Sequence, residues 1–593
     1  MSDLELSPIG NCQISALVDA KGSIVWGCIP RVDGDPVFCS LLNGDRKDAG
    51  SWRFELEGQV SATQRYMRNS PILVTRLKAD DGSALEIFDF APRFERSGRM
   101  YRPVALVRIV RPVAGAPRLK VQLTPMANYG EKLAPTTNGT NHVRYMIGDQ
   151  GLRLSTDAPI GYIVEQRSYR VEQDQHFFLG PDEPFVGNIR SELRKMEAGT
   201  LKYWQYWVRG LNIPLEWQDE VIRAAIALKL CQHEETGAIV AALTTSVPEA
   251  QGSGRNWDYR YCWIRDSYYT VQALNRIGAL DVLEKYLGYL RNIIDQAKGG
   301  QIQPLYSVMG DARLHEREAE HLAGYRGNAP VRIGNAAYKQ VQYDCFGQIV
   351  LPTAQAFFDT RLLRMADELD FARLEEVGEQ AWEKHDEPDA GLWEFRTRQE
   401  VHTYSAVMCW AACDRLANVA QRLDKPDRAA LWRERAEAIR ATIERNAWSE
   451  NGQHYKASFQ SDYLDASLLQ MIELRYLAPD DPRFIQTFAA VEHELRRGDH
   501  MLRYAAEDDF GSPETAFNFC TFWLIEALHL VGRSEEARSL FETMLGHRTR
   551  SGLLSEDLDF ETGELWGNFP QTYSLVGIIN CAGHLSRSWS TVR

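Results

Sequence analysis

Twelve segments with helical spacing follow one another from about residue 215 toward the C-terminus. Each carries apolar residues three and four positions apart, which is typical of a helix with one buried face. The segments lie near residues 217–233, 266–277, 280–297, 343–360, 368–384, 404–422, 427–446, 464–475, 483–496, 514–531, 533–547 and 571–586. Twelve helices in six hairpins close into a toroid with a funnel at one end, so we expect an (α/α)6 barrel over residues 215–593.

The first third of the chain has a different pattern. Short runs of alternating apolar residues are separated by turn sequences such as DDGS (80–83), PVAGAP (112–117) and GPDEP (180–184). In one of these runs Leu119, Val121 and Leu123 share a face. Many short strands at this spacing predict an antiparallel β-sandwich over residues 1–188.

The segment 189–211 has helical spacing and no internal proline, and we expect residues 189–214 to form a helical linker. The predicted fold is therefore a multidomain α and β chain, with an N-terminal antiparallel β-sandwich followed by an (α/α)6 barrel. The longest insertions between the barrel helices are rich in glycine, aromatic and charged residues and lie at 234–265, 298–342 and 548–570. Long loops on a rigid scaffold commonly carry binding and chemistry, so we expect the functional site there.

The charge balance excludes several classes of partner. The chain has 67 Lys and Arg against 81 Asp and Glu, a net charge of −14, and it has no run dense in Lys or Arg. This argues against binding to nucleic acid or to an acidic membrane surface. The sequence also has no apolar run of about 18 residues, so we expect no membrane span.

The N-terminus, MSDLELSPIGN, lacks the basic and apolar regions of a secretory signal, and the ten cysteines include no CxxC pair. Cys409 and Cys413 lie four positions apart in an apolar helical segment, which favours core packing over metal binding. These features predict a cytoplasmic protein in a reducing setting. The oligomeric state stays open, and a homo-oligomer is compatible with the sequence.

The densest cluster of charged and aromatic residues is RNWDYRYCWIRDS, at 255–267. It contains Arg255, Asp258, Arg260, Arg265 and Asp266 among Trp257, Tyr259, Tyr261 and Trp263. One interpretation is a structural ion-pair network packed against aromatic rings. The other is a sugar-binding wall, because sugar hydroxyls both donate and accept hydrogen bonds and sugar C–H faces are apolar. The segment holds more charge than a buried wall usually tolerates unpaired, which favours the second interpretation.

A second motif is DAGLWEFR, in which Glu394 lies between two aromatic residues. Loss of hydration beside aromatic rings favours the protonated form of a carboxyl, and a general acid working near neutral pH needs that form. The alternative is a structural glutamate paired with Arg396 or Arg398, and the spacing alone favours that alternative.

A third motif is the acidic loop SGLLSEDLDFETGELWGNFPQ, at 551–571. Its acidic residues are Glu556, Asp557, Asp559, Glu561 and Glu564. One interpretation is an acidic loop exposed to solvent. A calcium site is a second interpretation, but DLDFETGE differs from the EF-hand ligand pattern, which argues against it. We expect no metal and no cofactor. Two carboxylates from distant loops of one scaffold are what glycosidic bond cleavage requires, which leaves a carbohydrate-acting enzyme as one interpretation of the residues alone.

Taken in order, these motifs resemble those of glycoside hydrolase family 15, the inverting glucoamylases and bacterial trehalases. The similarity covers nearly the whole chain and begins with IGNCQISALVDAKGSIVWGCIPRVDGDPVF (9–38), similar to the opening strands of the β-sandwich in bacterial members. The other motifs are AALTTSVPE (241–249), RNWDYRYCWIRDS, HLAGYRGNAPVRIGN (321–335), QYDCFGQ (342–348), GLWEFR, RYAAED (503–508) and GLLSEDLDFETGELWGNFPQTYS.

The resemblance implies an acid and a base. Glu394 matches the family's general acid in its LWE motif, and Glu556 matches the general base in its SE motif. The acid protonates the glycosidic oxygen, and the base takes a proton from a water held beneath C1. An inverting pair must leave room for that water, so we expect a separation of roughly 6.5–9.5 Å between the two carboxyls.

The resemblance also implies a glucose-binding pocket. Arg265 and Asp266 match the pair that binds the terminal glucose in the innermost subsite, and Arg503 and Trp393 match further wall residues. Aromatic surface beside them is expected from Trp257, Tyr261 and Trp263. A dead-end pocket of this kind makes the attack exo-acting, with β-D-glucose released from a non-reducing end.

One position departs from the fungal members of the family. Many fungal glucoamylases carry a second glutamate directly after the general acid, where this chain has Phe395, and this argues against a preference for α-1,4-glucan. The motif HLAGYRGNAPVRIGN is more similar to the trehalase clade. We therefore expect an inverting α-glucoside hydrolase that acts on a small neutral α-glucoside as an α,α-trehalase. A glucoamylase- or isomaltose-type glucohydrolase stays open as the alternative.

Two other classes of function are less consistent with the motifs. A related α/α-barrel phosphorylase would use phosphate and need no base, whereas this chain has Glu556 in the expected context. A non-catalytic sugar-binding protein would keep the pocket without the acid–base pair, and both carboxyls are present here.

Overall fold

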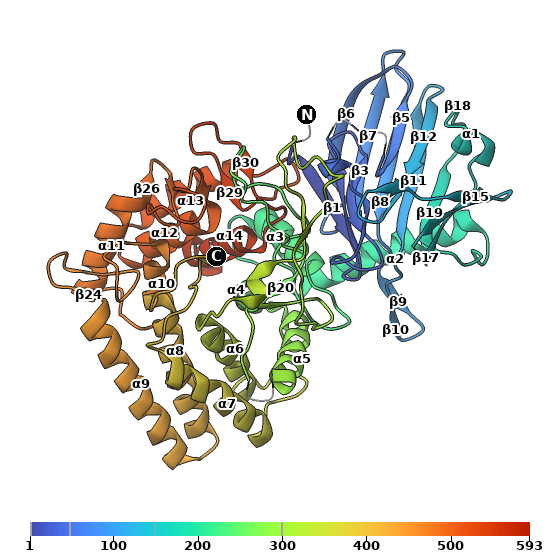
Figure 1. Ribbon diagram of the computed structural model, residues 1–593. Coiled ribbons are helices and arrows are strands. Elements are labelled where there is room, and N and C mark those ends of the chain that lie inside the picture. The colour runs from blue at the N-terminus through green and yellow to red at the C-terminus, as the bar shows by residue number, and fades with distance from the viewer. Residues whose placement is uncertain (1–2, 45, 47–48, 149, 298–299, 593) are drawn as a thin grey trace.

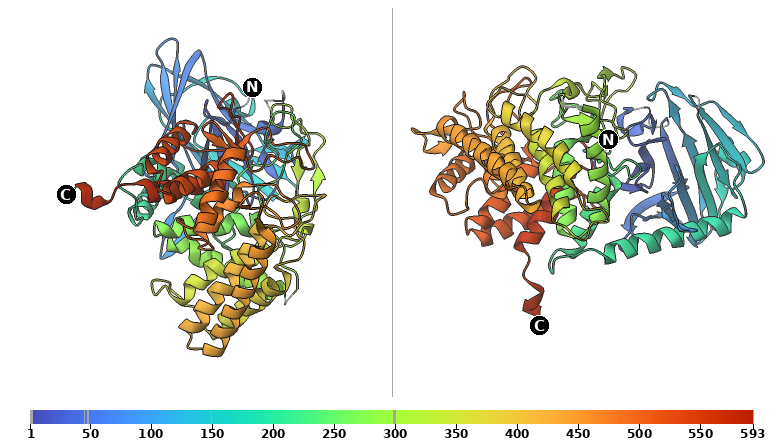
Figure 2. Two further views of the ribbon diagram at one scale, coloured as in Figure 1. Left: turned by 90° about the vertical axis from the view of Figure 1, so that its left-hand side faces the viewer. Right: turned by 90° about the horizontal axis from the view of Figure 1, so that it is seen from below.

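The computed structural model describes residues 3–44, 46, 49–148, 150–297 and 300–592. An N-terminal pair of sheets lies beside a C-terminal ring of helices (Figure 1, Figure 2). A long helix, α2 (Ile189–Arg209), runs along the sheets toward the helical part (Figure 1). The predicted fold class, a β-sandwich followed by an (α/α)6 barrel, is confirmed.

The N-terminal part consists of two antiparallel sheets. The first has the order β1-β2-β3-β5-β12-β18, with β4 paired to β3. Its strands are β1 Leu6–Gly10, β2 Ser15–Asp19, β3 Ile24–Cys28, β4 Pro36–Phe38, β5 Ser51–Leu56, β12 Arg118–Thr124 and β18 Tyr169–Arg170. The second has the order β15-β16-β17-β19-β11-β8-β7-β6. Its strands are β15 Thr136–Asn138, β16 His142–Ile147, β17 Gln150–Thr156, β19 Gln175–Pro181, β11 Leu106–Ala114, β8 Ala84–Phe90, β7 Leu73–Ala79 and β6 Gln59–Tyr66.

Alternation along the strands buries both faces of the second sheet. In β11, Leu106 packs in the core between the sheets, whereas Val107 and Ile109 point to the other face. Helix α2 covers that other face with Leu193 and Met196. The segment expected as a linker therefore also completes a hydrophobic core of the sheet domain.

The helical part forms two concentric rings. The inner ring contains α4 Ile264–Arg276, α6 Asp344–Ala354, α8 Thr403–Arg422, α10 Gln470–Glu473, α12 Asn518–Leu530 and α14 Thr572–Leu585. The outer ring contains α3 Gln218–Leu230, α5 Leu280–Ala297, α7 Glu368–Lys384, α9 Pro426–Ala447, α11 Pro482–Leu495 and α13 Ser534–Gly546. Helix α14 contacts α4, which closes the inner ring. Inner helices such as α12 are buried on nearly every side, as expected for helices surrounded by others.

One expected helix is much shorter than its apolar pattern suggested. In 464–475 the chain forms a 3-10 turn, Ala466–Leu469, followed by the single turn of α10. The Asp465 side chain accepts a hydrogen bond from the first turn, and Arg475 ends the segment with a left-handed φ of 61°. The apolar periodicity therefore marks a buried segment correctly but overstates its helical length.

Two other helices differ from their expected bounds. Helix α6 ends at Ala354 and the chain continues directly as a 3-10 turn, Gln355–Phe357, so only the first part of the expected segment 343–360 is α-helical. Helix α12 begins at Asn518, because the two residues before it, Ala516–Phe517, form strand β28.

Short ladders stiffen the loops between the helices. They are β20 Cys262–Trp263 with β21 Leu305–Tyr306, β22 Arg317–Glu318 with β23 Arg332–Ile333, β24 Trp448–Ser449 with β25 His454–Tyr455, β26 Arg496–Arg497 with β27 His500–Met501, and β28 with β29 Asp557–Leu558 and β30 Leu565–Trp566. The remaining short elements of the sheet domain are β9 Phe94–Arg96, β10 Arg99–Tyr101, β13 Met126–Ala127, β14 Lys132–Leu133 and α1 Ile160–Val164.

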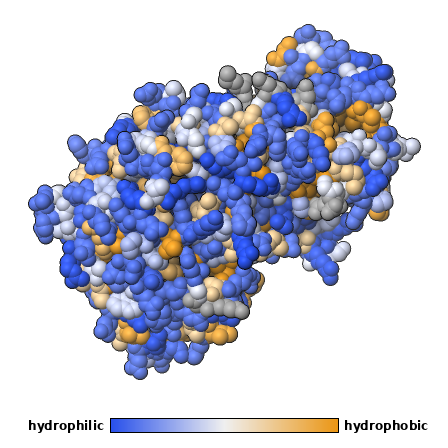
Figure 3. Space-filling view, in the orientation of Figure 1, coloured by the Kyte–Doolittle hydropathy of each residue, from blue (hydrophilic) through white to orange (hydrophobic). Residues whose placement is uncertain are grey.

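One hydrophobic cluster crosses the boundary between the sheet domain and the barrel, in addition to the separate cores of the sheet domain. Trp26 and Leu41 lie in the same buried cluster as Leu243 and Ile264 of the barrel. The face of the molecule in Figure 3 is predominantly hydrophilic. Among the described residues, no helix has both the length and the apolar character that a membrane crossing requires.

Candidate active site

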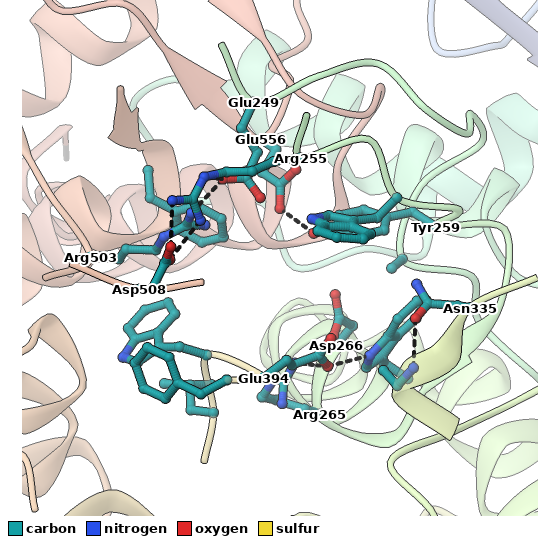
Figure 4. Close-up of a pocket in the computed structure, with 18 of the residues that line it drawn as sticks. Glu249, Arg255, Tyr259, Arg265, Asp266, Asn335, Glu394, Arg503, Asp508 and Glu556 are labelled. Atoms are coloured by element: carbon teal, nitrogen blue, oxygen red, sulfur yellow. Dashed lines mark hydrogen bonds and ion pairs between the residues drawn. The ribbon is translucent and has the colours of Figure 1, made fainter. Parts of the chain in front are cut away.

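Loops at one end of the barrel enclose a cavity of about 850 Å³ that is partly open to solvent (Figure 4). The expected site residues that line it are Trp257, Trp263, Arg265, Asp266, Trp393, Glu394, Arg503 and Glu556. Segments that are far apart in the sequence therefore meet around one space.

Glu394 lies on the loop between α7 and α8 and has a left-handed φ of 60°, which is uncommon for a residue other than glycine. Its Oε1 accepts hydrogen bonds from Trp263 Nε1 at 2.6 Å, from the Arg265 guanidinium at 3.0 Å and from Gln342 Nε2 at 3.3 Å. No hydrogen bond from the described residues reaches its Oε2. The three hydrogen bonds to Glu394 therefore all converge on one of its two oxygens.

The structural pairing considered for Glu394 is not formed. Arg396 donates instead to Glu316 at 3.3 Å, and the Arg398 guanidinium lies over the Phe395 ring at 4.0 Å. The interpretation of Glu394 as a partner of Arg396 or Arg398 is therefore wrong.

Arg265 and Asp266 occupy the first turn of α4. The Arg265 guanidinium donates to Tyr573 Oη and to Gln342 Oε1, both at 2.8 Å, in addition to Glu394. Burial raises the pKa of Asp266 to about 7, although the neighbouring guanidinium acts in the opposite direction. Figure 4 places both residues with Glu394, across the cavity from Glu556.

Glu556 is almost fully buried, and its Oε1 accepts a hydrogen bond of 2.6 Å from Tyr259 Oη. Burial raises the pKa of Glu556 well above its usual range, and the nearby carboxyls of Asp557 and Glu249 raise it further. The Tyr259 hydrogen bond and the Arg503 guanidinium lower it in part. Asp557 lines no part of the cavity and has its pKa raised by the same burial.

Two arginines form the wall beside Glu556. Arg503 pairs with Glu249, and Arg255 holds Asp508 with two N–H groups at 2.6 and 2.7 Å. Tyr504 donates a further hydrogen bond to Asp508. These ion pairs tie segments separated by some 250 positions, so the wall forms only when the barrel closes.

Aromatic rings cover the remaining walls. Trp393 packs edge-on against Phe517 and Tyr504, and its Nε1 donates to Asp465 at 2.9 Å. Trp257 also lines the cavity, and the Arg396 guanidinium lies over its ring at 4.1 Å. Such faces suit the apolar side of a ring whose hydroxyls meet charged groups.

Tyr261 does not line the cavity, so its assignment as a site residue is wrong. It is 7% exposed and packs with Leu305, Leu314 and Tyr338 in a small apolar cluster. The chain bends at Tyr261, which breaks the alternation that places Tyr259 and Trp263 toward the cavity.

The charged cluster at 255–267 divides into a buried ion pair and a set of residues that line the cavity. Asp258 and Arg260 form a fully buried ion pair at 2.7 Å that does not line the cavity, whereas Arg255, Arg265 and Asp266 do line it. The ion-pair network and the site are thus two sides of one segment.

Sequence reasoning missed several residues of the cavity. They are Glu249, Asn335, Gln340, Asp508, Gln571 and Tyr573. Glu249, Asn335, Asp508, Gln571 and Tyr573 lie within the motifs that carry the family resemblance, which was the available signal. The spacing of these residues along the sequence did not indicate which side chains would meet in the cavity.

Of the acidic residues of the loop at 551–571, Glu556 alone lines the cavity among the described residues, and the loop does not resemble a metal site. Asp559 accepts hydrogen bonds from its own turn, and Glu564 pairs with Arg326 at 2.6 Å. Within the described part of the chain, no group of three or more His, Cys, Asp or Glu residues is arranged to hold a metal ion.

Two family models match the chain. The model described as glycosyl hydrolases family 15 matches residues 217–583, and the model described as trehalase-like, N-terminal matches residues 4–176. Together they span both the barrel and the sheet domain.

Curated relatives match over nearly the full length. A protein named trehalase from Mycolicibacterium smegmatis is 31% identical, with 98% of this chain and 90% of that protein covered. A trehalase from Thermoplasma volcanium is 30% identical, with 98% and 93% covered. A solved structure of a bacterial glucoamylase complexed with acarbose has the same fold, with a TM-score of 0.70 at 13% identity and coverage of 98% and 93%.

Proposed function

This chain belongs to family 15 of the glycosyl hydrolases, and we propose that it hydrolyses α,α-trehalose with inversion at the attacked carbon. The observation that carries the proposal is the pair of carboxyls, Glu394 and Glu556, on opposite sides of one cavity (Figure 4). The relatives that are named trehalases and match over 98% of the chain support the choice of substrate.

Glu394 is the general acid of this proposal. Its Oε1 accepts three hydrogen bonds, so the proton is carried by Oε2. That proton passes to the glycosidic oxygen as the bond from this oxygen to C1 breaks, and the leaving glucose departs as a neutral molecule.

Glu556 is the general base of this proposal. It takes a proton from a water on the opposite face of the attacked ring, and the water oxygen bonds to C1. Tyr259 supports this role by donating to Oε1, because that hydrogen bond favours the ionised carboxylate.

The glucose that is attacked is bound by the residues around the two carboxyls. Arg265 supplies fixed N–H donors, and Asp266 supplies an acceptor beside them. Arg503 contributes a second guanidinium, and Trp393 contributes an apolar face. These roles follow from the chemistry of a neutral sugar ring, which needs donors, acceptors and a nonpolar surface together.

A disaccharide fits this proposal better than a polymer because two loops meet over the cavity. Asp509 accepts hydrogen bonds from the main-chain N of Arg396, at 2.6 Å, and from the hydroxyl of Thr397. The next residue, Phe510, packs edge-on against Trp257 at 5.3 Å. Arg396, Asp509 and Phe510 all line the cavity, so on this proposal the contacts between the two loops border the space for the second sugar.

We also place the protein in the cytoplasm as part of the proposal. All ten cysteines are buried and unpaired, which is the usual state in a reducing compartment. A neutral disaccharide needs no basic surface for its recognition, in keeping with the net charge of −14.

The test is glucose release from trehalose, maltose, isomaltose and soluble starch, measured side by side. The proposal predicts the highest kcat/KM on trehalose. A higher value on maltose or starch would assign a glucoamylase-type activity, and a higher value on isomaltose an isomaltose-type activity. Release from none of the four would contradict the proposed function altogether.

A further inference from the structure

The segment that carries Tyr259 is held from behind by the sheet domain. Arg260 is fully buried and donates two N–H groups to Asp258, at 2.9 and 2.7 Å. A third N–H donates to the carbonyl oxygen of Gly34, at 2.7 Å. Because Gly34 lies in the turn between β3 and β4, one guanidinium joins the sheet domain to the barrel.

Asp258 extends this connection to a second loop. Its Oδ2 accepts a hydrogen bond from the main-chain N of Gly334 at 3.2 Å, and its carbonyl oxygen accepts one from Asn335 Nδ2 at 3.3 Å. Asn335 lines the cavity. The carboxyl that pairs with Arg260 therefore also positions part of the cavity wall.

A second contact from the sheet domain reaches Tyr259 through the neighbouring segment that contains Ala242 and Leu243. Trp26 Nε1 donates to the carbonyl oxygen of Leu243 at 2.7 Å. The adjacent Ala242 donates its main-chain N–H to the carbonyl oxygen of Tyr259 at 3.0 Å. Tyr259 is thus placed between two attachments to the sheet domain.

Tyr259 contacts both sides of the proposed reaction. Its hydroxyl donates to Glu556 at 2.6 Å. Its ring packs edge-on against Trp263 at 5.4 Å, and Trp263 donates to Glu394 at 2.6 Å. A small displacement of this tyrosine would therefore disturb the base directly and the acid through one intermediate.

We propose that Arg260 is a positioning residue through which the N-terminal domain holds Tyr259, and with it Glu556, in the geometry that hydrolysis requires. The inference rests on the proposed function, because it concerns the same site. It gives the sheet domain a part in catalysis although no residue of that domain lines the cavity among the described residues.

The test compares Arg260→Lys with Arg108→Lys. Lysine keeps the positive charge but lacks the planar guanidinium group. It therefore cannot donate two hydrogen bonds to Asp258 and a third to the carbonyl oxygen of Gly34. Arg108 is a matched control, since it is also fully buried, bonds Asp89 with two N–H groups and donates to a main-chain carbonyl, all inside the sandwich. Both variants are assayed at a temperature at which circular dichroism shows them folded.

For Arg260→Lys we expect kcat on trehalose to fall about 10²-fold, as a displacement of about 1 Å can cause, with a smaller change in KM. The acidic limb of the pH profile should move to higher pH, because the Tyr259 hydrogen bond that lowers the pKa of Glu556 is loosened. The other groups facing Glu556, which are Asp557, Glu249 and Arg503, are unchanged in this variant. The control should keep the wild-type kcat and pH profile.

A second readout does not depend on activity. Hydrogen exchange measured by mass spectrometry should be faster over residues 241–263 in Arg260→Lys, and faster only in sandwich peptides in Arg108→Lys. Wild-type kcat, pH profile and exchange in Arg260→Lys would overturn the inference, as would an equal loss of kcat in the control. If the wild-type protein releases no glucose from any substrate, the proposed function fails, and the exchange data alone decide the positioning role.

Discussion

Glu394 and Glu556 lie in contrasting electrostatic surroundings. Glu394 borders the guanidinium of Arg265, whereas Glu556 borders two further carboxyls, those of Asp557 and Glu249. Burial raises the pKa of both Glu556 and Asp557, so this coupled pair retains a proton at a pH where an isolated glutamate would be ionised. The hydrogen bond from a tyrosine favours ionisation of Glu556, so we expect the retained proton to rest on Asp557.

This arrangement predicts the acidic limb of the pH profile. A base works only when ionised, and the pKa of Glu556 is raised by burial and by its carboxyl neighbours. Activity should therefore fall, as the pH is lowered, at a value above the usual glutamate pKa of about 4.3. The measurement is kcat/KM on trehalose as a function of pH. An acidic limb at or below that value would contradict the described surroundings of the base.

Amide substitutions should separate the two proposed roles. Glu394→Gln should lower trehalose hydrolysis about 10²–10⁴-fold but spare α-glucosyl fluoride more, because fluoride leaves without a proton. Glu556→Gln should lower turnover of both substrates, because both need an activated water. Glu561→Gln, the same change at an exposed position of the same loop, is the control. Intact turnover in Glu556→Gln would show that the base is assigned wrongly.

Residues of the candidate site could be predicted from the sequence only where a residue type suited to the chemistry also stood in a motif of the family. Glu394 and Arg265 stand in motifs whose residue types suit acid–base work and sugar binding, and both line the cavity. Tyr261 was expected to add aromatic surface because it lies in the same motif as Trp257 and Trp263, but the chain bends at Tyr261 and the ring packs in an apolar cluster instead. Glu249 was missed because its partner Arg503 is 254 positions away, and such a pair depends on how the barrel closes.

Helix α2 shows how one element can serve two functions in the fold. Its spacing predicted a helix correctly, but the idea of a linker did not anticipate that its apolar side covers the second sheet. The covering of the outer face of that sheet by α2 could not be inferred from one strand, since the sequence of β11 alone does not reveal what packs on each side. The spacing of apolar residues is a local property of the sequence, whereas tertiary structure decides which element packs on the apolar face.

Substitution in α2 should lower stability without changing catalysis. Leu193 is fully buried against the sheet, so Leu193→Ala should reduce the free energy of unfolding by about 2–5 kcal/mol. Tyr206, on the same helix, is 79% exposed, and Tyr206→Ala should change it by less than about 0.5 kcal/mol. Chemical denaturation measures both, with kcat on trehalose as the check on the site. Equal stability of the two variants would mean that α2 does not pack on the sheet as described.

The molecule as a whole is held together by a core that crosses the boundary between sheets and barrel. Trp26 and Leu41 are buried in the same cluster as Leu243 and Ile264. An apolar interface of this kind couples the stability of the two parts, whereas polar interfaces allow domains to move and unfold independently.

Thermal unfolding should therefore be cooperative over the whole chain. We expect circular dichroism, tryptophan fluorescence and glucose release to be lost in one coincident transition. Two separate transitions, with the barrel still active after the sheets have melted, would contradict a shared core. They would also contradict a role for the sheet domain in positioning Tyr259.

The most informative single measurement is proton NMR of trehalose hydrolysis at times shorter than mutarotation. Inversion converts the attacked glucose to the β anomer, while the leaving glucose keeps its α configuration, because its own C1–O bond is not broken. The account predicts α- and β-glucose in equal amounts in the first spectra. Initial formation of α-glucose alone would show retention and would contradict the assignment of Glu394 and Glu556 as an inverting pair.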